Sequence, residues 1–248
     1  MRKLTAIILA GIMSISTVMT AMADATGTPT VVGDPVEYIG LSDEQQYELN
    51  TFLTNFVSNG YYSSASCYFD TASPNIYWMV NNCYEYSQLK WSYRPESKEF
   101  AEKQYHYYRA YPIEEFNKAS EYLFGVTFTD EEIKSSYIGE SEYGIFYQDF
   151  NFYFPAADGE MLSTFAIADT MYIDSNGNQV VDFSVYKKNN ISIYDELSSY
   201  YLLSPEEAND YCNWSIITKV AVGRAVVVPT QYHWRNIYHL KAYYDTGI

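Results

Sequence analysis

Residues 165–186 contain the feature that most constrains the fold: two runs of strand-forming residues separated by Asn176-Gly177. An Asn-Gly dipeptide between two such runs is a strong short-range signal of a β-hairpin. We therefore expect a hairpin here, with further antiparallel strands built onto it.

The loop length follows from the faces of the two strands. A two-residue loop would place their apolar residues on opposite faces, whereas a three-residue loop that ends at Gly177 places them on one face. Met171 then lies opposite Val181, and Ile167 lies opposite Val185. Because a slip of one residue turns every side chain to the other face, burial selects the three-residue loop. Its glycine is expected in the left-handed conformation.

Asp169 interrupts the apolar phase of the first hairpin strand. One interpretation is a bulge at the sheet edge that turns the carboxylate to solvent, and the other is a carboxylate in a cavity. Buried carboxylates are rare unless they are paired. Arg224 interrupts an apolar phase of a later strand in the same way. We therefore predict that both side chains face one interior or cavity mouth, within reach of a salt bridge or one bridging water.

The first 23 residues are typical of a secretory signal peptide. Met1–Ala23 has a basic start, an apolar centre and an Ala-Met-Ala end, which is a cleavage pattern. No second apolar stretch approaches the roughly 18 residues that a membrane span requires. The expected product is a free secreted, extracellular protein of bacterial type that begins near Asp24.

The chain is strongly acidic. Its 248 residues carry a formal net charge of −16, and loss of Arg2 and Lys3 with the leader makes this −18. Such a surface repels phosphate backbones, which argues against nucleic-acid binding, and attracts cations or basic partners. The three cysteines do not form a disulfide framework, and neither they nor the three histidines have the spacing of a metal site.

Helical patterns come first in the chain and strand patterns follow. Residues 24–40 are predicted to be a flexible tether. Helices are predicted to begin at Ser42, which forms a capping box with Gln45, and at Ser73-Pro74, and a third is expected over residues 112–124. From residue 143 the apolar period changes from helical to two.

This order predicts the α+β class, with N-terminal helices packed on a curved, mainly antiparallel sheet of about five to six strands. Residues 41–248 are expected to form a single domain. The segments LNTFLTNFV, YPIEEFNKASEYLFG and FPAADGEMLSTFAIADTMYIDSNGNQVVDFSVY resemble secreted domains of unknown function from Gram-positive anaerobes. The order of helices and strands is also similar to the cone-shaped nuclear-transport-factor-like fold. The first resemblance implies compartment and fold, whereas the second is a similarity of topology, which does not license a function.

No catalytic signature is present. Residues 174–178, with Asp182 beyond, resemble the start of a calcium loop, but a turn explains the same residues and the twelfth position is Val185. No serine lies in a nucleophile elbow, and the histidines lack a helical partner. No metal and no cofactor are expected.

The 28 tyrosines allow two interpretations, an adhesive aromatic surface or amphipathic filler of the core. We favour a non-enzymatic binding or interaction domain, whose partner is a glycan, a cell-wall fragment or a protein. Its candidate binding residues are Asp169, Arg224, Trp234 and Tyr238. The alternative is a hydrolase or isomerase with a small pocket, in which Asp169 is the base.

Overall fold

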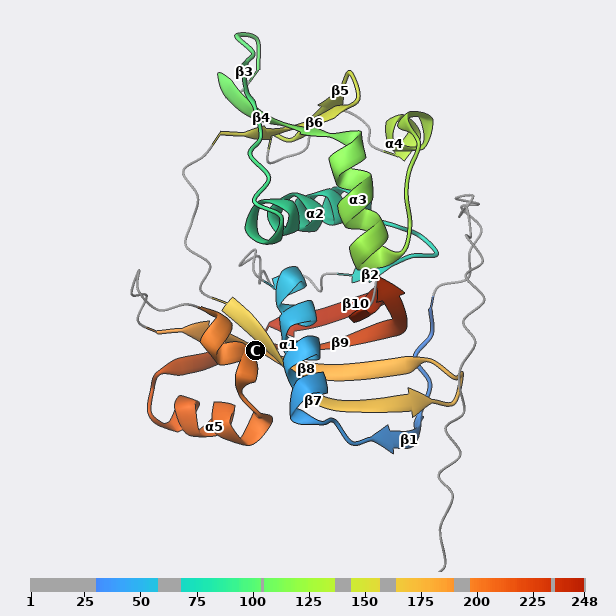
Figure 1. Ribbon diagram of the computed structural model, residues 1–248, viewed down its shortest axis with the longest axis vertical. Helices are drawn as coiled ribbons and strands as arrows, with labels where there is room; N and C mark the ends of the chain where they lie inside the picture. Colours follow the sequence, from blue (N-terminus) through green and yellow to red (C-terminus); the bar gives the residue numbers. More distant parts are fainter. Residues whose placement is uncertain are drawn as a thin grey trace, which may run out of the picture.

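A computed structural model describes residues 30–57, 68–103, 105–136, 144–156, 164–189, 197–232 and 235–247 (Figure 1). The strands are Pro35–Ile39 (β1), Tyr68–Asp70 (β2), Ser97–Glu99 (β3), Tyr107–Pro112 (β4), Phe146–Gln148 (β5), Asn151–Pro155 (β6), Thr164–Asp174 (β7), Gln179–Lys188 (β8), Ile217–Tyr232 (β9) and Arg235–Gly247 (β10). The helices are Asp43–Val57 (α1), Ile76–Lys90 (α2), Ile113–Phe124 (α3), Asp130–Ser136 (α4) and Pro205–Asn213 (α5), with a 3₁₀ helix at Leu197–Leu202 (η1). The structure is therefore of mixed α+β type.

The strands form two antiparallel sheets. Six strands pair in the order β1-β7-β8-β9-β10-β2, and four in the order β3-β4-β6-β5. The expectation of one sheet is wrong on this point, because β6 pairs with β4 and β5, and not with the central hairpin. In Figure 1, α2 and α3 lie between the two sheets, and α1 crosses the near face of the larger one.

The tether predicted over residues 24–40 is wrong for its second half. Residues 35–39 form β1, which pairs with β7 from Ile39↔Met171 to Pro35↔Asp174. The predicted signal peptide and residues 24–29 lie outside the described residues. In the part of the chain that the structure describes, every helix is too short or too polar to cross a membrane.

The predicted helices are confirmed in place, and one predicted start is wrong. Ser42 and Gln45 form the capping box, with backbone-to-side-chain bonds of 3.1 and 3.3 Å. The third helix ends at Gly125, whose φ of +70° is left-handed. The second helix begins at Ile76, because Asn75, and not Ser73, accepts the capping hydrogen bond from the Trp78 amide.

The core joins both sheets through the helices. One cluster of buried residues includes Leu49 and Phe52 of α1, Phe116 of α3, Phe183 of β8 and Phe152 of β6. We call the face of the larger sheet that packs on this cluster the inner face, and the opposite face the outer face. Residues of the larger sheet alternate between the two faces.

The hairpin turn has the predicted geometry. Met171 pairs with Val181 and Ile173 with Gln179, and Gly177 has φ of +78°. The loop is therefore the three-residue form. The pairing predicted further along the hairpin is wrong, because Ile167 lies opposite Ser184 and not Val185. A register shift between Ala168 and Thr170 makes Asp169 a bulge, which moves Ile167 to the outer face.

Substitution of Gly177 by alanine is expected to lower the free energy of unfolding by about 1 kcal/mol, because alanine is strained at positive φ. A Cβ at this position would meet nothing within 4 Å, so the cost comes from the backbone alone. Chemical denaturation measures it, and Gly177→Asn is the control, since asparagine tolerates the left-handed region. Equal stability of the alanine and asparagine variants would contradict the assignment.

Candidate functional site

The bulge at Asp169 lies at the edge of β7, near the point where the neighbouring strand β1 ends and side chains of α1 bond to the β7 backbone instead. β1 ends at Ile39, opposite Met171, and the β7 backbone beyond it is bonded by polar side chains of α1. The Ala168 amide donates to Asn50 Oδ1 at 2.8 Å, and the Ala168 carbonyl accepts from Gln46 Nε2 at 2.8 Å. These side chains satisfy backbone hydrogen-bonding groups at an edge that would otherwise be open to another strand.

Two groups of residues cover the ends of the outer face. At one end, η1 and α5 pack through Tyr201, Leu203 and Ala208 against a group of sheet residues: Phe165, Ile167, Tyr186 and Ile217. At the other end, Val32 packs with Tyr244 against a second group: Tyr172, Val180, Val226 and Ala242. The middle of the outer face is covered by neither group.

A cavity of about 690 Å³, which we call the outer pocket, lies in this part of the outer face. Its charged lining residues are Asp169, Asp182 and Arg224. Its other lining residues are Thr30, Val31, Val32, Phe183, Val222, Gly223 and Tyr244. The outer pocket therefore combines largely apolar walls with three ionisable side chains.

Arg224 is paired with Asp182, so the direct salt bridge predicted between Arg224 and Asp169 is wrong, and the alternative of one bridging water stays a prediction. Arg224 Nε lies 2.6 Å from Asp182 Oδ1, and Nη2 lies 3.1 Å from Oδ2. The two residues are direct neighbours across β8 and β9, so sheet register brings them together. Arg224 also lies over the Tyr172 ring, 5.9 Å from its centroid. Asp169 and Arg224 do line the same pocket, from different parts of its wall.

Asp169 is half-buried and accepts a hydrogen bond from the hydroxyl of Ser184 at 2.5 Å. Burial raises the pKa of its carboxyl, and the Ser184 bond and the charge of Lys219 oppose that shift. Among the described residues, no lysine or arginine forms an ion pair with it. The carboxylate is therefore held in the cavity wall by one neutral donor.

The chain segment before β1 forms another wall of the outer pocket. The Thr30 amide and hydroxyl both donate to the fully buried carboxylate of Asp70. The hydroxyl of Tyr244 donates to the Thr30 carbonyl at 2.8 Å. Asn176 Nδ2, in the hairpin turn, donates to the Val31 carbonyl at 2.9 Å. Three separate parts of the chain thus fix this segment.

The β-hairpin turn also explains the residues that resemble a calcium loop. The Asp174 carboxylate accepts backbone hydrogen bonds from Gly33, Asn176 and Asn178. Although burial opposes it, these bonds and that of the Asn178 side chain lower the Asp174 pKa. Across the residues that are described, no three His, Cys, Asp or Glu side chains are grouped to hold a metal ion.

Of the two predicted aromatic site residues, the structure describes Tyr238 alone, and Tyr238 does not join Asp169 and Arg224. Trp234 lies outside the described residues. Tyr238 packs on the inner face, with its ring 5.9 Å from that of Phe52, and burial raises its pKa. The last strand does not keep one apolar face, because a bulge between Leu240 and Ala242 sends these two residues to opposite sides.

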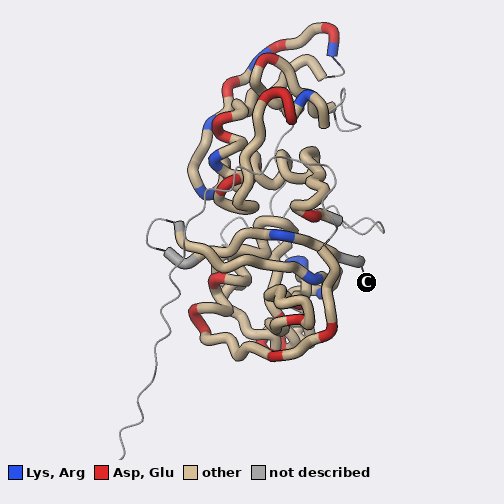
Figure 2. Tube along the Cα trace, turned by 90° about the vertical axis from the view of Figure 1, so that its right-hand side faces the viewer, with Lys and Arg blue, Asp and Glu red and all other residues tan. Residues whose placement is uncertain are grey.

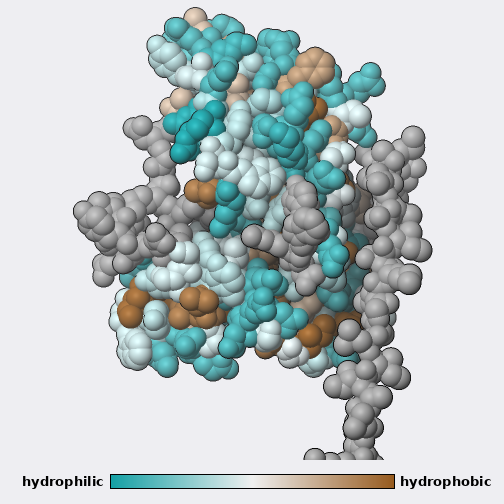
Figure 3. Space-filling model, in the orientation of Figure 1, coloured by the Kyte–Doolittle hydropathy of each residue, from teal (hydrophilic) through white to brown (hydrophobic). Residues whose placement is uncertain are grey.

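More of the described tyrosines are buried in the core than are well exposed. Nine described tyrosines are buried and four are well exposed, which favours the interpretation as amphipathic filler. The pair Tyr107-Tyr108 illustrates this, since Tyr107 is exposed and Tyr108 fully buried. On the face seen in Figure 3, exposed apolar residues are scattered over a largely hydrophilic surface.

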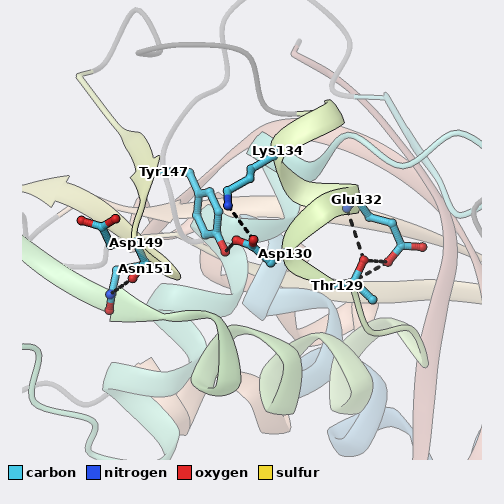
Figure 4. A network of polar contacts seen from close by, with 7 residues as sticks. All are labelled: Thr129, Asp130, Glu132, Lys134, Tyr147, Asp149 and Asn151. Carbon is cyan, nitrogen blue, oxygen red and sulfur yellow. Dashed lines mark hydrogen bonds and ion pairs between the residues drawn. The ribbon is translucent and has the colours of Figure 1, made fainter.

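A second polar network, around α4, has a structural role (Figure 4). Thr129 and Glu132 form a capping box, and Asp130 accepts from the Tyr147 hydroxyl at 2.8 Å and from Lys134 at 2.6 Å. The hydrogen bond from Lys134 lowers the Asp130 pKa. These contacts tie α4 to β5 with every partner satisfied by a neighbour, so they suggest no site.

The sequence interpretation missed Asp182, Val222, Tyr244 and the segment 30–32. Asp182 alternates with the apolar residues Val181 and Phe183, so its outward orientation was readable from the sequence. Its pairing with Arg224 was not readable from the sequence, because it depends on the register between β8 and β9.

Compared with protein-family models, with curated proteins and with solved structures, the chain matches none.

Proposed function

We propose that this protein is a secreted binding domain that holds a small organic ligand in the outer pocket without transforming it. The observation that carries the proposal is the outer pocket itself, whose volume of about 690 Å³ falls among those of small-molecule sites, roughly 300–1,000 Å³. Its lining also has the usual composition of such sites, apolar walls with a few fixed polar groups.

The polar groups are held in place before any ligand arrives. Arg224 and Asp182 fix each other through two hydrogen bonds, and Ser184 fixes Asp169. Such preorganisation reduces the entropic cost of binding. The carboxylates and the guanidinium can form hydrogen bonds with ligand hydroxyls, and Tyr244 and Val222 can pack against a carbon framework. A sugar unit of a glycan or a cell-wall fragment has both features.

The experiment that tests this proposal is a calorimetric screen of the mature protein against monosaccharides, oligosaccharides and cell-wall fragments, with a variant that fills the outer pocket. Val222 lines the pocket and is 38% exposed, so Val222→Trp should fill it and abolish binding. The matched control is Val228→Trp, because Val228 is exposed on the same strand but does not line the pocket.

Retained binding in the Val228 variant and lost binding in the Val222 variant is the expected result. A ligand that binds both variants equally well binds outside the outer pocket, and that result would overturn the proposal. Complete absence of binding in the screen would overturn it too.

One observation favours a second candidate function, a hydrolase or isomerase that uses Asp169 as general base. Its carboxyl lines the outer pocket, and burial raises its pKa toward the range that suits a base. The two candidates differ in what happens to a bound ligand. A binding domain returns the ligand unchanged after prolonged incubation, whereas an enzyme converts it and loses turnover in Asp169→Asn.

A further inference from the structure

The charges in the outer pocket do not balance. Arg224 is the one cationic lining residue among those described, and Asp182 occupies its Nε and Nη2 atoms. This pair contributes no net charge. Asp169 is the remaining charged group, so a vacant pocket above the pKa of Asp169 carries one surplus negative charge.

Asp169 has one carboxylate oxygen free for a ligand. Oδ2 accepts from Ser184, and in the described part of the chain Oδ1 has no hydrogen-bond donor. The charged and titratable groups that act on it are Lys219, Asp182 and Tyr186, and no ion pair joins Asp169 to Lys219. A carboxylate that is half removed from water and unpaired gains more from a cation than an exposed one does.

The molecule as a whole also carries a net negative charge. The formal net charge is −16, and Figure 2 shows acidic residues on both parts of the molecule with lysine and arginine interspersed. A potential of this sign raises the local concentration of cations and lowers that of anions. Anionic ligands are therefore disfavoured on approach as well as inside the pocket.

We infer that the outer pocket selects a ligand with a positively charged amine, with Asp169 as its counter-ion. This inference rests on the proposed binding function and names its ligand class. The ammonium group lies at Asp169, and the carbon body of the ligand contacts Val31, Val222 and Tyr244. An amino sugar and a cyclic alkylamine both have this chemistry.

The test compares each amine with a neutral partner of the same shape. The probes are glucosamine with N-acetylglucosamine and cyclohexylamine with cyclohexanol, titrated by calorimetry at neutral pH and low salt. The amine of each pair should bind about tenfold more tightly, as one charge-assisted hydrogen bond implies. Asp169→Asn should abolish this preference while it keeps an oxygen acceptor for Ser184.

Glu37→Gln is the matched control, because it removes the same charge from exposed β1, outside the outer pocket. It should leave the preference intact. Amine affinity of the unmodified protein should be complete between the pKa of Asp169 and the pKa of the amine, and it should fall as the pH is lowered through the pKa of Asp169. In Asp169→Asn this pH dependence should disappear.

Three failures are distinguishable. If the neutral partners bind as tightly as the amines and Val222→Trp still blocks them, the inference is overturned and the binding function stands. If no probe and no other ligand in the screen binds, both are overturned. A preference for amines that survives in Asp169→Asn, with thermal melts showing that the variant is folded, assigns the selectivity to another group and also overturns the inference.

Discussion

Replacement of Asn50 by leucine is expected to lower the free energy of unfolding by about 4 kcal/mol, because three backbone groups each lose a hydrogen bond to its buried side chain. Asn50 is fully buried. Its Nδ2 donates to the carbonyls of Tyr201 and Leu203 at 2.9 and 3.1 Å, and its Oδ1 accepts from the Ala168 amide at 2.8 Å. One side chain therefore joins α1, η1 and the bulged strand β7.

The control is Asn81→Leu on α2, which makes the same substitution at a half-buried site. Among the described residues, Asn81 Nδ2 donates to the Tyr77 carbonyl of its own helix and to no other group. The Asn81→Leu substitution should lower the free energy of unfolding by no more than about 1 kcal/mol, as for other substitutions away from buried networks. Urea denaturation measures both values, and hydrogen exchange at the Ala168 amide should accelerate in the Asn50 variant alone. Comparable stability of the two variants would show that the Asn50 bonds contribute little.

Substitution of Gly223 by alanine is the second change with a large expected effect, about 3 kcal/mol of lost stability, as for overpacking of a dense core. An added Cβ would lie 2.2 Å from Cζ of Phe183 and 2.7 Å from the Tyr244 carbonyl oxygen. Phe183 is fully packed and its ring lies 5.5 Å from that of Tyr243, so it has little room to move. The aromatic ring occupies the space that the glycine leaves free.

Gly40→Ala is the matched control, because a Cβ there would meet nothing within 4 Å. Its melting temperature should remain near that of the unmodified protein. Gly223→Ala combined with Phe183→Leu should recover only part of the loss, because the contact with the Tyr244 carbonyl remains. A Gly223→Ala protein as stable as Gly40→Ala would mean that β8, β9 and β10 separate at little cost.

The structural features that were predictable from the sequence are local ones. The left-handed Gly177, the capping box of Ser42 and Gln45 and the end of α3 at Gly125 each depend on residues within one turn. Caps and tight turns are decided by backbone geometry and by side chains a few residues apart. The pairing of Met171 with Val181 follows directly from such a turn.

The candidate site was predictable only in part. The sequence indicated Asp169 and Arg224 as exceptions to an apolar pattern, and both line the outer pocket. It did not indicate that Asp182 pairs with Arg224, because that contact depends on how two strands 42 positions apart align. Nor did it indicate that Thr30, held by the buried Asp70, forms a wall of the pocket.

The sequence by itself determined the class of the fold, its helices and the turn of its central hairpin, since apolar period and turn chemistry act over short distances. The tertiary structure decided where the extra residue of β7 is placed. Asn50 binds the Ala168 backbone just where β1 has ended, and the strand bulges at the next residue. That bulge moves Ile167 to the outer face and leaves Asp169 in the wall of the outer pocket. Contacts between segments distant in the chain therefore set the site, because only the folded chain brings α1, β1 and β7 together.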